Sequence, residues 1–187
     1  MARSQKLAAL ALAAAVALGA AGCAAGGSAS PAGPQADPAT GEVISGTGYH
    51  FSVPEDWGDP GPVEGFDPDS IAADLDDADG FSDNVNVILS PAGKVTPEQV
   101  ETAGVKELED AGATDVTVQP RVAVGGSESA HLSAALASSG AEYVVEQYYV
   151  SDSDQTYVVT FSFSPTVSEA DRAAVTDPIL ASWEFED

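Results

Sequence analysis

The second half of the chain contains four candidate strand segments, and in two of them, residues 128–137 and 156–164, apolar side chains recur at every second position. This period of two limits what the chain can fold into. In residues 156–164, every second side chain from Tyr157 to Phe163 is a valine or an aromatic residue, so these side chains share one face of an extended segment. Short polar connections join the last three segments, as is typical of antiparallel neighbours. The pattern predicts an antiparallel meander over residues 115–119 (extendable to 124), 128–137, 142–150 and 156–164.

The first part of the chain predicts two more strands and a long loop. Residues 49–53 alternate apolar with smaller or polar side chains and end at Pro54, and residues 84–90 alternate in the same way. Between these strands, residues 59–83 are dense in Asp, Pro and Gly. We expect that segment to be mostly loop, because these residues favour turns over regular structure.

Two helices are predicted. Thr96, Pro97 and Gln99 combine a capping hydroxyl, a proline at the first helical position and an amide that can return a hydrogen bond to the cap. This helix should run to about residue 111, where Gly112 ends it. One stripe of it, expected to pack on the sheet, consists of Val100, Gly104, Leu108 and Ala111.

The second predicted helix begins after Ser168 and contains Pro178, which we expect to kink or restart it. Residues 183–185 then form a short final strand. Helices at two places around an antiparallel meander indicate the α+β class, with an antiparallel β-sheet flanked by helices.

The N-terminal leader ends at Cys23, the only cysteine of the chain. Two basic residues precede an apolar run of 12 residues, Leu7 to Leu18, which is shorter than the about 20 residues that span a bilayer. The leader resembles the bacterial lipobox, which implies a signal peptide over residues 1–22 and a diacylglyceryl group on the Cys23 thiol. Ala20 stands where leucine is commoner in this signal, so a plain secretory signal is the alternative.

Two parts follow the leader. Residues 23–46 are mostly small and polar, which predicts a flexible tether, and residues 47–187 are long enough for one domain with its own core. A diacylated cysteine holds a protein firmly at a bilayer without a spanning helix. We therefore expect the domain at the cell membrane, lipid-anchored, on its extracytoplasmic face.

The mature chain is strongly acidic. Removal of residues 1–22 leaves four basic residues against thirty acidic ones, a net charge of −26. Such a surface repels phosphate backbones and anionic lipid headgroups, so we expect no nucleic acid partner and no membrane contact apart from the lipid anchor. Cationic partners are favoured, although acidity also serves solubility.

The order of the motifs resembles a known fold. A Tyr-x-Phe-x-Val-Pro-x-x-Trp opening, an Asn-Val-Asn-Val strand, a helix, a long meander and a closing helix before Ser-Trp-Glu-Phe together resemble the PsbP-like fold, over roughly residues 48–187. More closely they are similar to the LpqN-type lipoproteins of actinobacteria. The resemblance implies a PsbP-like α/β/α sandwich, in a family whose members act by binding something larger. Together with the lipid anchor, the tether and the lack of a catalytic motif, it leads us to expect a non-enzymatic binding or accessory module of the cell envelope, with an envelope protein as partner.

Catalytic residues and cofactors are not expected. The only two histidines, His50 and His131, fall inside predicted strands, and neither lies near a Gly-x-Ser-x-Gly turn. We interpret His131 as a solvent-facing or hydrogen-bonded histidine and His50 in the same way. A tetrahedral zinc site lacks ligands, because Cys23 would be acylated.

Calcium binding is the alternative to a purely protein-binding role, within a small-ligand or cation-binding lipoprotein. The candidate ligands are Asp74, Asp76, Asp77 and Asp79, since hard cations prefer several carboxylates. The spacing does not match a helix-loop-helix calcium motif, so a solvated acidic loop is the competing interpretation. The polar Thr160 and Ser162 further suggest that part of one sheet face is exposed, where an interface would fit.

Overall fold

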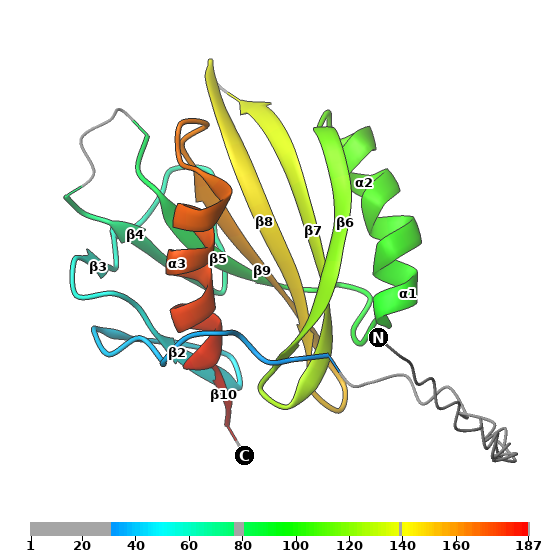
Figure 1. Ribbon diagram of the computed structural model, residues 1–187, viewed down its shortest axis with the longest axis horizontal. Helices are drawn as coiled ribbons and strands as arrows, with labels where there is room; N and C mark the ends of the chain where they lie inside the picture. The colour runs from blue at the N-terminus through cyan, green and yellow to red at the C-terminus, as the bar shows by residue number, and fades with distance from the viewer. Residues whose placement is uncertain (1–30, 77–80, 139, 187) are drawn as a thin grey trace, which may run out of the picture.

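The structure of the protein, a computed structural model, describes residues 31–76, 81–138 and 140–186. These residues form two antiparallel sheets, with helical segments on both faces of the larger one (Figure 1). The predicted α+β class is confirmed. The larger sheet has seven strands, in the order β3 (Trp57–Gly58), β4 (Ser70–Asp74), β5 (Asn84–Leu89), β9 (Thr156–Phe163), β8 (Ala141–Ser151), β7 (Ser127–Ser138) and β6 (Thr114–Val124).

The predicted meander is present as strands β6 to β9, each antiparallel to the next. Residues directly opposite each other share a face: Val159 of β9 lies opposite Tyr148 of β8, which lies opposite His131 of β7. Leu132 is one residue further along β7, so it points to the other face. The apolar stripes of β7 and β9 therefore belong to separate cores on opposite faces of the sheet.

A smaller sheet closes the main core. It has the order β1 (Val43–Gly46), β2 (Tyr49–Ser52) and β10 (Glu184–Phe185). The fully buried Tyr49 and Phe51 of β2 cluster with the aromatic stripe of β9. Trp183 stacks on Tyr49 with their ring centroids 4.4 Å apart, so the two ends of the domain meet in one aromatic cluster.

The folded part begins earlier than the predicted tether of residues 23–46 allows. Strand β1 lies inside that range, and its buried Ile44 pairs with Phe51. The segment before β1 also contacts the domain, since the carbonyl of Ala32 accepts a hydrogen bond from Ala123 and Ala39 donates one to Pro178. β1 has only two large apolar residues, Val43 and Ile44, and it forms an edge strand because its backbone pairs with that of β2.

Most of the described residues in 59–83 are loop, as predicted, and strand β4 is the exception. Ala72 and Ala73 are buried, and β4 pairs with β5 from Ser70 to Ala73. The short sequence Ser-Ile-Ala-Ala-Asp has little β-propensity and no clean alternation, so pairing with β5 decides its conformation.

The first predicted helix runs without a break through α1 (Pro97–Gln99), a π-helical turn η1 (Val100–Gly104) and α2 (Val105–Asp110). Thr96 and Gln99 form the expected capping box. Val100 packs on Ala130 and Leu132 of β7. Ala111, expected on the buried stripe, is exposed because it follows the last helical residue.

The last helix, α3 (Glu169–Ala181), begins at the Ser168 cap and continues through Pro178 to Ala181. It packs on the face opposite the helix 97–110, as Figure 1 shows, so the larger sheet lies between helical layers. Within the described part of the chain, no helix is both long and apolar enough to cross a membrane.

Candidate functional site

A groove of about 730 Å³ lies between β1 and the segment that leads into β4. We call it the acidic groove. One wall is formed by residues 42–45, and the other by residues 59–71. β1 is an edge strand of its sheet, and β4 pairs with β3 only at Ala73 and Asp74, so the groove lies where the edges of both sheets are incompletely covered.

Large apolar side chains are exposed in this groove. Val43 is 57% exposed, Val63 44% and Phe66 38%, which makes three of the six exposed large apolar side chains among the described residues. A tight turn presents two of them, because Phe66 N donates a hydrogen bond to Val63 O. Gly65 in this turn has φ of 77°, a conformation that favours glycine. The sequence thus fixes two apolar side chains at the rim of the groove.

The charged side chains of the groove are all acidic. Glu42, Asp59, Asp67 and Asp69 line it. Residues 31–93 contain thirteen acidic residues and no lysine or arginine, so this part of the domain has no permanently charged basic side chain of its own to offset them. The groove is therefore both apolar and strongly anionic.

Two of these carboxylates are held in place by the fold. Asp69 Oδ2 accepts a hydrogen bond from Thr47 N at 2.8 Å, and Asp69 Oδ1 accepts one from Thr47 Oγ1 at 2.7 Å. These bonds tie the β1–β2 turn to the start of β4. Asp59 Oδ1 accepts from Gly61 N at 2.7 Å, which shapes the same wall, formed by residues 59–71, at its other end. The Thr47–Asp69 hydrogen bonds thus connect the two sides of the groove, and the Asp59–Gly61 bond orders one wall locally.

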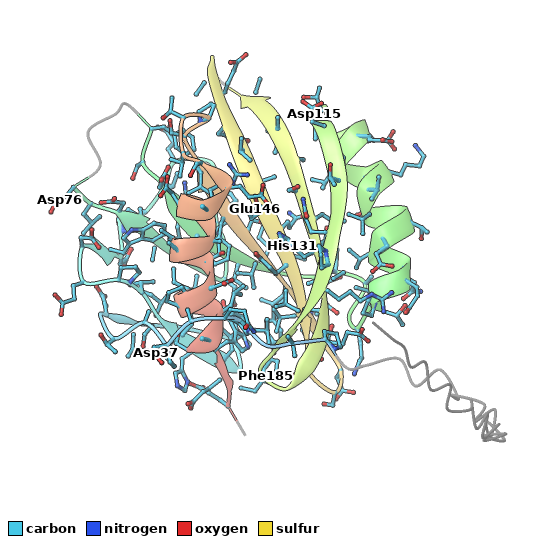
Figure 2. The ribbon with its side chains drawn as sticks, viewed as in Figure 1. Asp37, Asp76, Asp115, His131, Glu146 and Phe185 are labelled. Atoms are coloured by element: carbon cyan, nitrogen blue, oxygen red, sulfur yellow. The ribbon has the colours of Figure 1, made fainter. Side chains whose placement is uncertain are left out.

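A second pocket, of about 460 Å³, lies under α3 and contains His131. The buried Glu146 accepts a hydrogen bond from Arg172 Nε at 2.8 Å and lies 2.8 Å from His131 Nε2 (Figure 2). The imidazole also stacks on Tyr148 at a centroid distance of 4.0 Å. Burial raises the pKa of the Tyr148 hydroxyl. His131 is hydrogen-bonded, in line with the interpretation from the sequence, and the cluster joins α3 to β7 and β8.

The other histidine has acidic neighbours on strand β10 and directly after it. His50 Nε2 lies 3.5 Å from Glu184 and its Nδ1 3.4 Å from Glu186. Both histidines lie in strands, as predicted, and they belong to different sheets.

The predicted calcium ligands are only partly described. Asp74 ends β4, and its Oδ1 accepts a hydrogen bond from Asp76 N at 2.9 Å. Figure 2 shows Asp76 at the edge of the molecule far from the helix 97–110. Asp77 and Asp79 lie outside the described residues, as does Cys23. The ranges that the structure describes contain no group of three acidic, histidine or cysteine side chains able to hold a metal ion, so calcium binding stays a prediction.

The predicted exposed sheet face is partly covered. Ser162 is buried and Thr160 is half-buried, accepting a hydrogen bond from Gln147. Next to them, a cavity of about 330 Å³ separates the helix 97–110 from β5, β8 and β9. Its lining is largely apolar and includes Val100, Leu108 and Tyr149.

The acidic groove was missed by sequence reasoning because half of it belongs to the expected tether and half to the expected loop. One signal was available: Val63 and Phe66 are large apolar residues inside a segment otherwise rich in Asp, Gly and Pro. Apolar residues that a loop keeps without burying them indicate contact with something else.

No family model matches the chain, and no curated protein matches it. Similar solved structures include the cyanobacterial PsbP protein CyanoP of Synechocystis sp. PCC 6803, with 17% identity, a TM-score of 0.50, and 82% of this chain and 99% of CyanoP covered. LpqN of Mycobacterium tuberculosis, which is involved in cell envelope biogenesis, has 15% identity and a TM-score of 0.50, with 82% of this chain and 88% of LpqN covered.

A protein of Bacteroides thetaiotaomicron has 13% identity and a TM-score of 0.49 over 79% of this chain, which spans only 50% of that protein. Together with the strand order and the helical layers, the similarity to CyanoP and LpqN shows that this chain has a PsbP-like α+β fold.

Proposed function

Starting from this PsbP-like fold, we propose that the protein is a non-enzymatic binding or accessory module of the cell envelope. The observation that carries the proposal is the acidic groove, where apolar side chains remain exposed on a folded domain. Exposed apolar patches of this kind are typical of interaction sites. The similarity in fold to LpqN, a protein of cell envelope biogenesis, is compatible with such a role.

The proposed location follows from the leader. A lipid on Cys23 would hold the protein at the extracytoplasmic face of the membrane, as in an actinobacterial lipoprotein of the LpqN type. An envelope protein is then the natural partner, because the anchor confines the domain to the surface where such proteins assemble.

Binding fits the groove better than catalysis does. Its lining consists of carboxylates, small polar residues and apolar residues, and among the described residues that form it there is no histidine, cysteine or lysine to act as a base or nucleophile. The histidine of the second pocket is engaged by a carboxylate that also binds Arg172. A nucleophile placed beside it is needed for the commonest hydrolytic mechanisms, and Ser133 in that pocket is already bonded to Gln119.

A photo-crosslinking amino acid in place of Val63 tests the proposal in living cells that make the full chain. Val118 on β6 is the matched control site, because both valines are 44% exposed and Val118 lies outside the groove. We expect one defined protein adduct from position 63 and none from position 118. The Cys23→Ser variant should lose this adduct, because it cannot be lipidated. Adducts no stronger at position 63 than at position 118 would contradict the proposal.

Small-ligand binding is a second candidate, favoured by the apolar cavity beneath the helix 97–110. Its about 330 Å³ is the size of a small ligand site. Thermal unfolding with and without apolar ligands, and with and without calcium, tests this role. A ligand that binds only the folded state raises the unfolding temperature, and the rise grows with the logarithm of ligand concentration over Kd.

A further inference from the structure

We propose that the acidic groove binds an extended cationic segment of a partner protein, in which lysine or arginine residues alternate with apolar ones. This inference rests on the proposed binding function and names the chemistry of the partner. The groove offers exposed Val43, Val63 and Phe66 to apolar side chains and its carboxylates to cationic ones. A partner that carried only one of these chemistries would leave half of the groove unmatched.

The charge of the groove differs from that of the other acidic surfaces. On the helical side of the molecule, the Arg121 guanidinium lies within ion-pair distance of Glu98, Glu101 and Glu128. Residues 31–93 contain no lysine or arginine, so Asp59 and Asp67 have no such counter-charge close in sequence, and none lines the groove. A cationic partner would supply the positive counter-charge that Arg121 provides for the carboxylates on the helical side.

The same charge argues against other occupants. Nucleic acids and anionic lipid headgroups carry the sign that the groove repels. A second copy of this chain has few cations to offer, because all four basic residues after the leader are engaged: Lys94 donates to Asp152 O, Lys106 pairs with Asp110, Arg121 binds its three glutamates and Arg172 binds Glu146.

The groove is preformed. Thr47 holds Asp69 through two hydrogen bonds, and the Val63–Phe66 turn fixes the apolar rim. A preformed site loses little conformational freedom on binding, so modest complementarity gives measurable affinity. The two incompletely covered sheet edges that border the groove suit an extended segment, because an edge strand has main-chain groups free to pair with another strand.

The test uses the purified full chain and a short fluorescent peptide of alternating lysine and leucine, titrated by fluorescence anisotropy. A second peptide has serine in place of leucine and keeps the same charge. Two groove variants are compared with the wild-type chain. One is a double variant that carries both Asp59→Asn and Asp67→Asn, and the other carries Val63→Ser alone. Asparagine at position 59 keeps the oxygen that accepts from Gly61 N.

Matched controls remove the same groups elsewhere: Glu109→Gln with Asp154→Asn for charge, and Val118→Ser for the apolar side chain. All of these positions are exposed and lie outside the groove. We expect the groove variants to weaken binding of the lysine–leucine peptide by at least about fivefold for the double variant and about threefold for Val63→Ser. The control variants should stay within about twofold, and the lysine–serine peptide should bind more weakly.

Equal losses in groove and control variants would overturn the inference, because binding would then reflect net charge alone. Equal affinity for the two peptides would overturn it as well, since the apolar rim would have no part in recognition. The inference would also be overturned if the lysine–leucine peptide did not bind the wild-type chain. Crosslinking from position 63 does not depend on the peptides. If it captured a partner protein while the peptide did not bind, the proposed binding function would stand and the proposal of a cationic segment would be wrong.

Discussion

At the scale of single residues, Glu146 is a buried polar side chain that links α3 to the larger sheet. It is 6% exposed and compensated by Arg172 and His131. Removing either the carboxylate or its charged partner should lower the stability of the fold, because an unpaired buried charge is strongly destabilising.

Glu146→Gln should therefore lower the free energy of unfolding by about 3 kcal/mol, since the amide leaves the Arg172 charge without its counter-ion. Urea unfolding monitored by tryptophan fluorescence measures this loss. Asp110→Asn is the control, because it breaks the exposed Lys106–Asp110 pair and should change stability by less than about 1 kcal/mol. Equal effects of the two substitutions would show that the Glu146 cluster contributes no more than a surface pair.

At the scale of elements, Arg121 joins its own strand, β6, to three others. Its guanidinium reaches from β6 to Glu98 on α1, Glu101 on η1 and Glu128 on β7. Hydrogen bonds from Arg121 lower the pKa of the Glu101 carboxyl below its ordinary value. A carboxyl whose folded pKa is lowered stabilises the fold above its unfolded pKa, and this stabilisation is lost as pH falls through the folded value.

Arg121→Gln should consequently lower the urea midpoint at pH 7, and the difference from wild type should shrink as pH falls below about 4, where the unfolded carboxyl takes up its proton. Unfolding curves at pH 7, 5 and 3 measure it, with Lys106→Gln as the control on an exposed pair. A difference as large at pH 3 as at pH 7 would mean that Arg121 acts through packing.

The elements also show where sequence reasoning succeeds. The meander, β5 and both helices were predicted because their alternation or capping residues are local to each segment. Strands β1 and β4 were not predicted, because each is short and takes its conformation from a partner strand. The acidic groove could not be predicted for the same reason, since its walls are β1 and the segment before β4.

At the scale of the whole molecule, the sheet separates two cores whose placement the sequence does not determine. Each apolar stripe was visible, but only the register from Val159 through Tyr148 to His131 assigns them to opposite faces. Charge repulsion also acts on the whole molecule. The thirty acidic residues repel one another most strongly when the chain is compact.

Salt should therefore stabilise this fold. Raising NaCl from about 0.01 M to 1 M shortens the Debye length from about 30 Å to about 3 Å, and we expect the melting temperature to rise by at least about 4 °C. Scanning calorimetry measures the rise. A variant with four of the exposed acids replaced, Asp56→Asn, Asp59→Asn, Glu64→Gln and Asp67→Asn, should show a smaller one. A melting temperature that does not rise with salt would refute the expected self-repulsion.

The pairing of β10 with β2 has a consequence for the order of events during synthesis. Tyr49 and Phe51 are translated well before Trp183, which stacks on both, and Phe185, which lies opposite Tyr49. The aromatic cluster cannot close until Trp183 and Phe185 have been made, and contacts so distant in sequence form slowly. While the residues in between are being translated, the nascent chain thus carries Tyr49 and Phe51 without the partners that bury them.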